Sequence, residues 1–149
     1  HGLALAAHKR GFRPELYLNT KETLFVDGVR QKEKKEIIKL SQDGFEKEIK
    51  ANKIQMRHDL DWSSLEDIVT RGGIALVLIS SYRLTNSKVP HWVAVSGISA
   101  DFVFFSDPYM EEGDNMVTNT NVPVRKDEFE KMAKYGGKQI KSILAIFRD

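Results

Sequence analysis

Two apolar runs joined by a short polar stretch constrain the fold of this chain more than any other feature. Residues 89–109 read VPHWVAVSGISADFVFFSDPY, and both runs are rich in β-branched and aromatic side chains. Such residues favour strands, and a short break between two such runs is typical of a β-hairpin. A third run, IALVLIS at residues 74–80, is apolar almost throughout and predicts a buried central strand beside the hairpin.

Helical patterns precede these strands. GLALAAHKRG at residues 2–11 predicts a short helix, and residues 31–50 predict a long amphipathic helix with an interruption at Gly44. Residues 61–73 predict a third helix, in which Ser63 and the glutamate three positions later form a capping box. The apolar stripe expected on the long helix consists of Ile37, Ile38, Leu40, Phe45 and Ile49.

Further strands are expected near both ends of the chain. ELYLN at residues 15–19 predicts a strand, whereas TLFVDGV at residues 23–29 fits either a strand or a turn. VPVRK at residues 122–126 predicts a short edge strand, because its proline is tolerated only at an edge. A short helix capped by Asp127 and a strand within residues 140–149 follow. Since helices come mostly early and strands mostly late, we expect an α+β fold with helices packed on an antiparallel sheet.

The composition excludes several classes of protein. The 149 residues suffice for a single domain, residues 1–149, with its own core. A net charge of +2 gives no basis for binding nucleic acid, and no apolar run approaches the ~18 residues of a membrane span. The sequence contains no cysteine, which excludes a disulfide, a thiolate metal site and a cysteine nucleophile within these residues. The four histidines show no metal-ligand spacing, so we expect no metal or other cofactor.

The hairpin carries a histidine and an aspartate toward one point. If the turn is a three-residue loop at residues 99–101, Asp107 falls opposite Val93. His91 then lies one diagonal away on the same face, about 7–8 Å along the backbone, and an imidazole and a carboxylate can meet across that gap. A two-residue turn would place the two side chains on opposite faces, because a one-residue slip inverts the alternation.

Such a pair has a chemical and a structural interpretation. Both faces of the hairpin are apolar, which predicts a place in the middle of the sheet, where an aspartate needs a hydrogen-bonding partner. A carboxylate bonded to an imidazole fixes the imidazole's tautomer, as in a general base that deprotonates a nucleophile. Alternatively, His91 simply begins a strand, and Ser-Asp-Pro forms a turn in which Asp107 accepts backbone hydrogen bonds. The spacing leaves both interpretations open.

The two motifs also resemble those of a known family. PHWVAVSGI followed by FVFFSDPY is similar to the histidine and aspartate motifs of the bacteriocin-processing, double-glycine type cysteine peptidases in the papain-like superfamily. GLALAAHKRGF resembles the second helix of that fold, and LEDIVTRGGIALVLIS resembles the helix and strand before the histidine strand. The resemblance covers most of the chain and looks closest to a bacterial branch of stand-alone or acetyltransferase-fused peptidase-like proteins.

The resemblance implies an α+β, papain-like (cysteine proteinase) fold that hydrolyses a peptide or amide bond through a Cys-His-Asp triad. His91 would be the general base and Asp107 the residue that orients it. The cysteine, and a glutamine of the oxyanion hole, are expected upstream of His1, on a nucleophile-bearing helix that this chain lacks. The alternative is a catalytically inactive peptidase-like module, which has lost the nucleophile and binds a peptide or leader segment.

The resemblance also bears on partners and on further site residues. It implies a cytoplasmic protein with a peptide or protein substrate, and an acetyltransferase domain in the same polypeptide as a candidate partner. Tyr82, Arg83 and Trp92 border the expected cleft and are candidate substrate contacts, although aromatic residues beside a hairpin also serve as ordinary packing. Ser80 and Ser81 end a strand near the site but lack the sharp strand-to-helix turn of a serine nucleophile.

Overall fold

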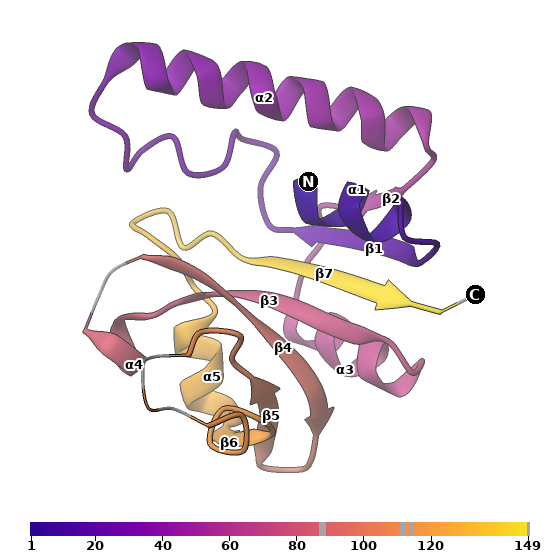
Figure 1. The fold of residues 1–149 in the computed structure, drawn as a ribbon, viewed down its shortest axis with the longest axis vertical. Coiled ribbons are helices and arrows are strands. Elements are labelled where there is room, and N and C mark those ends of the chain that lie inside the picture. The colour runs from indigo at the N-terminus through magenta and orange to yellow at the C-terminus, as the bar shows by residue number, and fades with distance from the viewer. Residues whose placement is uncertain (87–88, 111–112, 114, 149) are drawn as a thin grey trace.

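One seven-stranded sheet runs through the protein, and helices cover both of its faces (Figure 1). The computed structural model describes residues 1–86, 89–110, 113 and 115–148. The elements in chain order are α1 (Gly2–His8), β1 (Arg13–Leu18), α2 (Lys32–Ala51), β2 (Gln55–Arg57), α3 (Trp62–Thr70), β3 (Ile74–Ser80), α4 (Tyr82–Thr85), β4 (Pro90–Ile98), β5 (Phe102–Ser106), β6 (Val122–Arg125), α5 (Lys126–Met132) and β7 (Ser142–Phe147).

The sheet is mixed rather than antiparallel throughout. Its strands lie in the order β2-β1-β7-β3-β4-β5-β6, and β1 and β2 are parallel while the other neighbouring pairs are antiparallel. The predicted α+β class is confirmed, whereas the prediction of a purely antiparallel sheet is wrong. No strand was predicted at β2, because three residues are too few for a periodic pattern. Helix α2 supplies the crossover that a parallel pair requires.

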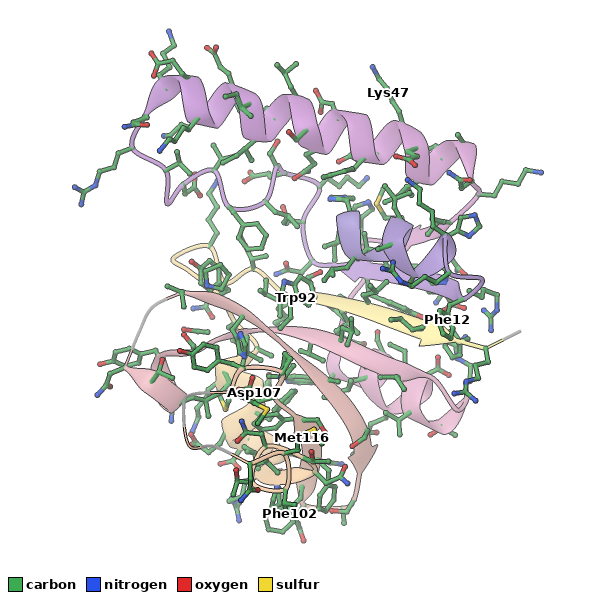
Figure 2. The ribbon with its side chains drawn as sticks, viewed as in Figure 1. Phe12, Lys47, Trp92, Phe102, Asp107 and Met116 are labelled. Atoms are coloured by element: carbon green, nitrogen blue, oxygen red, sulfur yellow. The ribbon has the colours of Figure 1, made fainter. Side chains whose placement is uncertain are left out.

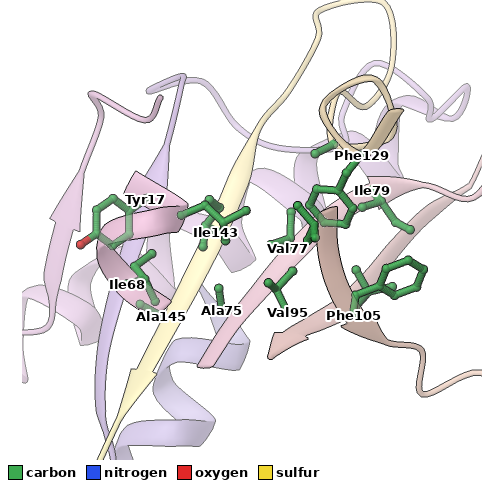
Figure 3. Close-up of a cluster of buried hydrophobic side chains, with 14 of the residues drawn as sticks. Tyr17, Ile68, Ala75, Val77, Ile79, Val95, Phe105, Phe129, Ile143 and Ala145 are labelled. Atoms are coloured by element: carbon green, nitrogen blue, oxygen red, sulfur yellow. The ribbon is translucent and has the colours of Figure 1, made fainter. Parts of the chain in front are cut away.

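Two apolar clusters, one on each face, stabilise the sheet. Alternate residues of β3, β4, β5 and β7 face α3 and α5, and their side chains form one cluster with Phe129 of α5 (Figure 3). On the opposite face, α1 and part of α2 cover β1 and β7 (Figure 1). The first cluster includes the fully buried Ile68, Ala75, Ile79, Val93 and Val95.

The predicted helix boundaries need three corrections. α2 runs without a break through Gly44. Asp61 caps α3 by accepting a hydrogen bond from a backbone N–H of the first turn, and Ser63 lies inside the helix. The carboxylate takes the cap because it stands one residue ahead of the helix, where the strongest N-cap residues act. α5 begins at Lys126, so that Asp127 lies in its first turn and does not cap it.

Helix α2 buries only a part of its predicted apolar stripe. Ile49 is 1% exposed and belongs to the second cluster, whereas Ile37 and Leu40 are 61% and 71% exposed. Lys47 points away from the sheet on the outer side of the helix (Figure 2). Residues 23–29, for which the sequence fitted either a strand or a turn, form turns.

A buried carboxylate on β1 ties the C-terminal end of α3 to the sheet. Glu15 of β1 is 3% exposed and accepts hydrogen bonds from Arg71 at 3.0 and 3.2 Å and from the Tyr17 hydroxyl at 2.8 Å. Arg13 contributes a second cation. Burial alone would raise the pKa of the Glu15 carboxyl, but the hydrogen bonds from Arg71 and Tyr17 and the charge of Arg71 hold it below its ordinary value. The strand pattern of residues 15–19 gave no indication of this cluster.

The Phe147 ring packs against the two arginines of this cluster and leaves no room for a side chain at Gly73. The guanidinium groups of Arg13 and Arg71 each lie 4.5 Å from the ring centre, and a Cβ on Gly73 would lie 2.5 Å from the ring. We therefore expect Gly73→Ala to lower the free energy of unfolding by about 1–3 kcal/mol, because the buried ring must move. Denaturant unfolding measures the change.

The matched control is Gly44→Ala, on the exposed side of α2. An added Cβ there meets nothing within 4 Å, and alanine favours a helix interior by up to about 1 kcal/mol relative to glycine. Equal stabilities for the Gly73→Ala variant and the unchanged protein would contradict the predicted clash.

Candidate active site

His91 and Asp107 meet at one end of the strands, where β3 ends and β4 begins. His91 pairs with Ile79 across these strands, and Asp107 directly follows β5 (Asp107 is labelled in Figure 2). His91 Nε2 lies 2.6 Å from Asp107 Oδ1. The two side chains are 22% and 17% exposed, so the pair lies at the rim of the core, where a reacting group can reach it.

The hairpin register differs from the predicted one near its turn. Ile98 pairs with Val103, whereas a three-residue loop requires Ile98 to pair with Phe102. A β-bulge between Val95 and Gly97 then shifts the register by one residue, so that Ala94 pairs with Ser106. The next residue, Asp107, consequently lies level with Val93, as predicted, although the turn itself was predicted wrongly. The hairpin was predicted to lie in the middle of the sheet. This is only partly right, because β6 alone separates β5 from the edge of the sheet.

Backbone groups hold the aspartate from two sides. Asp107 Oδ1 accepts a second hydrogen bond from the Tyr109 N–H at 2.8 Å, and the Asp107 N–H donates to the Asn119 carbonyl at 2.9 Å. The Tyr109 ring stands edge-on to the imidazole, with centroids 6.4 Å apart. Because the carboxylate accepts the proton of Nε2, the other ring nitrogen, Nδ1, is the basic one, and it has no hydrogen-bond partner among the described residues.

An open cavity of about 310 Å³ lies beside the pair. Its apolar walls are Leu84, Val89 and Tyr109, which are 44%, 50% and 57% exposed. Ser81 and Thr85 complete the lining together with the pair itself. A basic nitrogen next to an open, partly apolar cavity can take a proton from a group that enters the cavity from outside.

Three of the other candidate residues, Tyr82, Arg83 and Trp92, are not part of the cavity lining. Arg83 forms an ion pair with Glu128 of α5, and Tyr82 is 48% exposed on α4. Trp92 points to the opposite face of β4 from His91, since neighbouring strand residues alternate. Ser81 does line the cavity, but it is 5% exposed and bonded to the Val89 carbonyl.

Residues that the sequence did not single out complete the site. Leu84, Val89 and Tyr109 form the cavity walls, and Asn119 holds the aspartate. Only Tyr109 carried a signal, through its place directly after the Asp-Pro motif. The described residues contain no group of three histidine, aspartate or glutamate side chains placed to hold a metal ion.

Comparisons with known proteins place the chain in a family. A family model described as Peptidase_C39 like matches residues 1–147, nearly the whole chain. No curated protein and no solved structure gives a significant match. In the described part of the chain, no helix combines the length and the hydropathy needed to cross a membrane.

Proposed function

Because the chain belongs to the Peptidase_C39 like family, we propose that it is the general-base part of a thiol peptidase with a papain-like fold. His91 would take the proton of a cysteine thiol through Nδ1, and Asp107 would orient the ring and stabilise the imidazolium that forms. The thiol would come from a segment outside these 149 residues, since the sequence has no cysteine. The observation that carries the proposal is the 2.6 Å contact between Nε2 and Oδ1, which leaves Nδ1 without a hydrogen-bond partner in the described part of the chain.

The substrate class follows from the family and from the cavity. A peptidase-like family suggests a peptide, and the cavity beside His91 offers apolar walls in which the pair carries the only charged side chains among the described lining residues. The same polypeptide would carry the cysteine and its oxyanion-hole glutamine, and an acetyltransferase domain remains a candidate partner. We place the protein in the bacterial cytoplasm on the same resemblance.

The rate of thiol alkylation tests the proposal directly. In the longer protein that carries the cysteine, the thiol should react with iodoacetamide near neutral pH as a thiolate paired with the His91 imidazolium. His91→Gln is expected to slow this alkylation about tenfold, because a thiol without the imidazolium is largely protonated near neutral pH. The higher nucleophilicity of an ordinary thiolate offsets part of this loss.

The control is His58→Gln, which removes a histidine whose ring contacts the Thr20 carbonyl, outside the candidate active site. It should leave the alkylation rate unchanged. If His91→Gln has as little effect as this control, the general-base role is wrong.

A second candidate function is peptide binding without cleavage. The absence of cysteine from the sequence favours it, and so do the exposed Leu84 and Val89 at the mouth of the cavity. Under this alternative, the longer protein would bind a peptide or leader segment and release it intact, as mass spectrometry of the recovered peptide would show.

A further inference from the structure

The loop of residues 115–121 contacts the hairpin at the two places that decide where Asp107 points. We propose that two of its residues, Asn119 and Asn121, are positioning residues that hold the Asp107 carboxylate against His91. Their catalytic value rests on the proposed function, but the positioning itself can be measured in this chain without any activity.

The first of the two places is the β-bulge at Ser96. If the register of Ile98 and Val103 continued along the hairpin, Asp107 would fall opposite Ala94. The side chain of Ala94 points to the other face of β4 from that of His91, so the pair could not form. The extra residue in the bulge restores the matching face, and such bulges often re-aim a side chain beside an active site.

Asn121 fixes this bulge from across the hairpin. Its Oδ1 accepts a hydrogen bond from the Ser96 hydroxyl at 2.6 Å, and its N–H donates to the Ser106 hydroxyl at 3.3 Å. Ser106 immediately precedes Asp107. Asn121 has φ +53°, in the left-handed region that asparagine adopts more readily than most residues. The side chain and the backbone of one residue thus connect the bulge to the end of β5.

Asn119 holds the second place, the turn that contains Asp107. Its carbonyl accepts the Asp107 N–H at 2.9 Å, and its Nδ2 donates to the Tyr109 carbonyl at 2.7 Å. Because the Tyr109 N–H in turn donates to Asp107 Oδ1, the amide of Asn119 fixes the backbone that anchors the carboxylate. Removing this amide frees Tyr109, and with it the direction of Oδ1.

The exchange of the His91 Nε2–H proton with water reports on this positioning. In the unchanged chain the proton lies in the hydrogen bond to Asp107, so proton NMR should show it as a slowly exchanging signal. We expect Asn119→Ala and Asn121→Gly each to speed up its exchange about tenfold, as for the loss of one net hydrogen bond. Glycine is chosen at position 121 because it keeps the left-handed backbone while removing the side chain.

Two further variants separate positioning from mere stability. Asn121→Asp keeps an oxygen for the Ser96 hydroxyl and a residue tolerant of the left-handed region, so it should restore the slow exchange. Asn115→Ala removes a side chain that caps Val117 and Thr118 in the same loop without touching the hairpin, and should lower the melting temperature alone.

Unchanged exchange in both Asn119→Ala and Asn121→Gly would overturn the proposal, and so would equally fast exchange in Asn115→Ala. In the longer protein, Asn119→Ala should lower kcat about ten- to hundredfold with little change in KM, since misplacing a catalytic group affects the chemical step. A failure of the proposed function would appear in the alkylation assay, whereas a failure of the positioning would appear in the exchange rates.

Discussion

Replacing Asp107 with alanine is expected to lower the rate of peptide hydrolysis about 10²- to 10⁴-fold in the protein that carries the thiol. The variant removes the acceptor of the His91 Nε2–H and the charge that stabilises the imidazolium. It also removes the acceptor of the Tyr109 N–H, so the turn loosens together with the ring. Hydrolysis of a peptide mixture, followed by mass spectrometry, measures the loss.

Asp107→Asn separates orientation from charge. Its Oδ1 can still accept from both the ring and the Tyr109 N–H, but it carries no negative charge, so its rate should lie between those of Asp107→Ala and the unchanged protein. The control is Asp101→Asn, an exposed carboxylate at the hairpin turn that should have no effect. A fully active Asp107→Ala variant would refute the triad.

Glu15→Gln is expected to lower the free energy of unfolding by about 2–4 kcal/mol near neutral pH. The carboxylate is buried, and its loss leaves Arg71 and Arg13 facing a neutral amide; breaking a buried ion pair by removing one partner is strongly destabilising. The expected loss is smaller than for an ion pair in which both partners are buried, because the Arg71 and Arg13 side chains are 37% and 51% exposed. Denaturant unfolding of both proteins provides the measurement.

The same carboxylate makes stability depend on pH in a defined direction. Its pKa in the folded protein is held below the ordinary value of about 4.3. Its contribution is therefore complete above that ordinary value and is lost as the pH falls through it toward the lowered folded value. The stability difference between the unchanged protein and Glu15→Gln should narrow accordingly as the pH falls below about 5.

Glu66→Gln is the matched control for this cluster. Glu66 also forms an ion pair, with Lys126 at 2.8 Å, but its side chain is 57% exposed. Exposed pairs contribute about 0–1 kcal/mol, so this variant should stay close to the unchanged protein at every pH. Equal losses for Glu15→Gln and Glu66→Gln would mean that burial does not set the strength of the cluster.

The strands of the fold could be predicted wherever their side chains form apolar runs. β3, β4 and β5 follow from the composition of residues 74–105, because strands buried on at least one face need such runs. β2 could not be predicted, since its three residues pair through the backbone and bury little. The exposed Ile37 and Leu40 on α2 show the converse limit: an apolar pattern predicts a helix without telling how much of it is covered.

The candidate site was predictable in its residues but not in its mechanism of assembly. The motifs around His91 and Asp107 pointed to the pair, and the structure brings the two side chains into contact. The turn length was predicted wrongly, and the bulge at Ser96 compensates for it. A bulge depends on contacts such as that between Ser96 and Asn121, which lie 25 positions apart, and no local pattern reveals such a contact.

The position of β7 has a consequence for how the chain can reach its folded state. β7 comes after every other strand in the sequence yet lies between β1 and β3, which share no pairing of their own. During synthesis on a ribosome, residues 1–57 and 74–125 would thus emerge as two separate parts of the sheet, which can join only after β7 has been synthesised. Assembly that depends on such distant segments is slow, and the unpaired edges of β1 and β3 are exposed to association with other chains in the meantime.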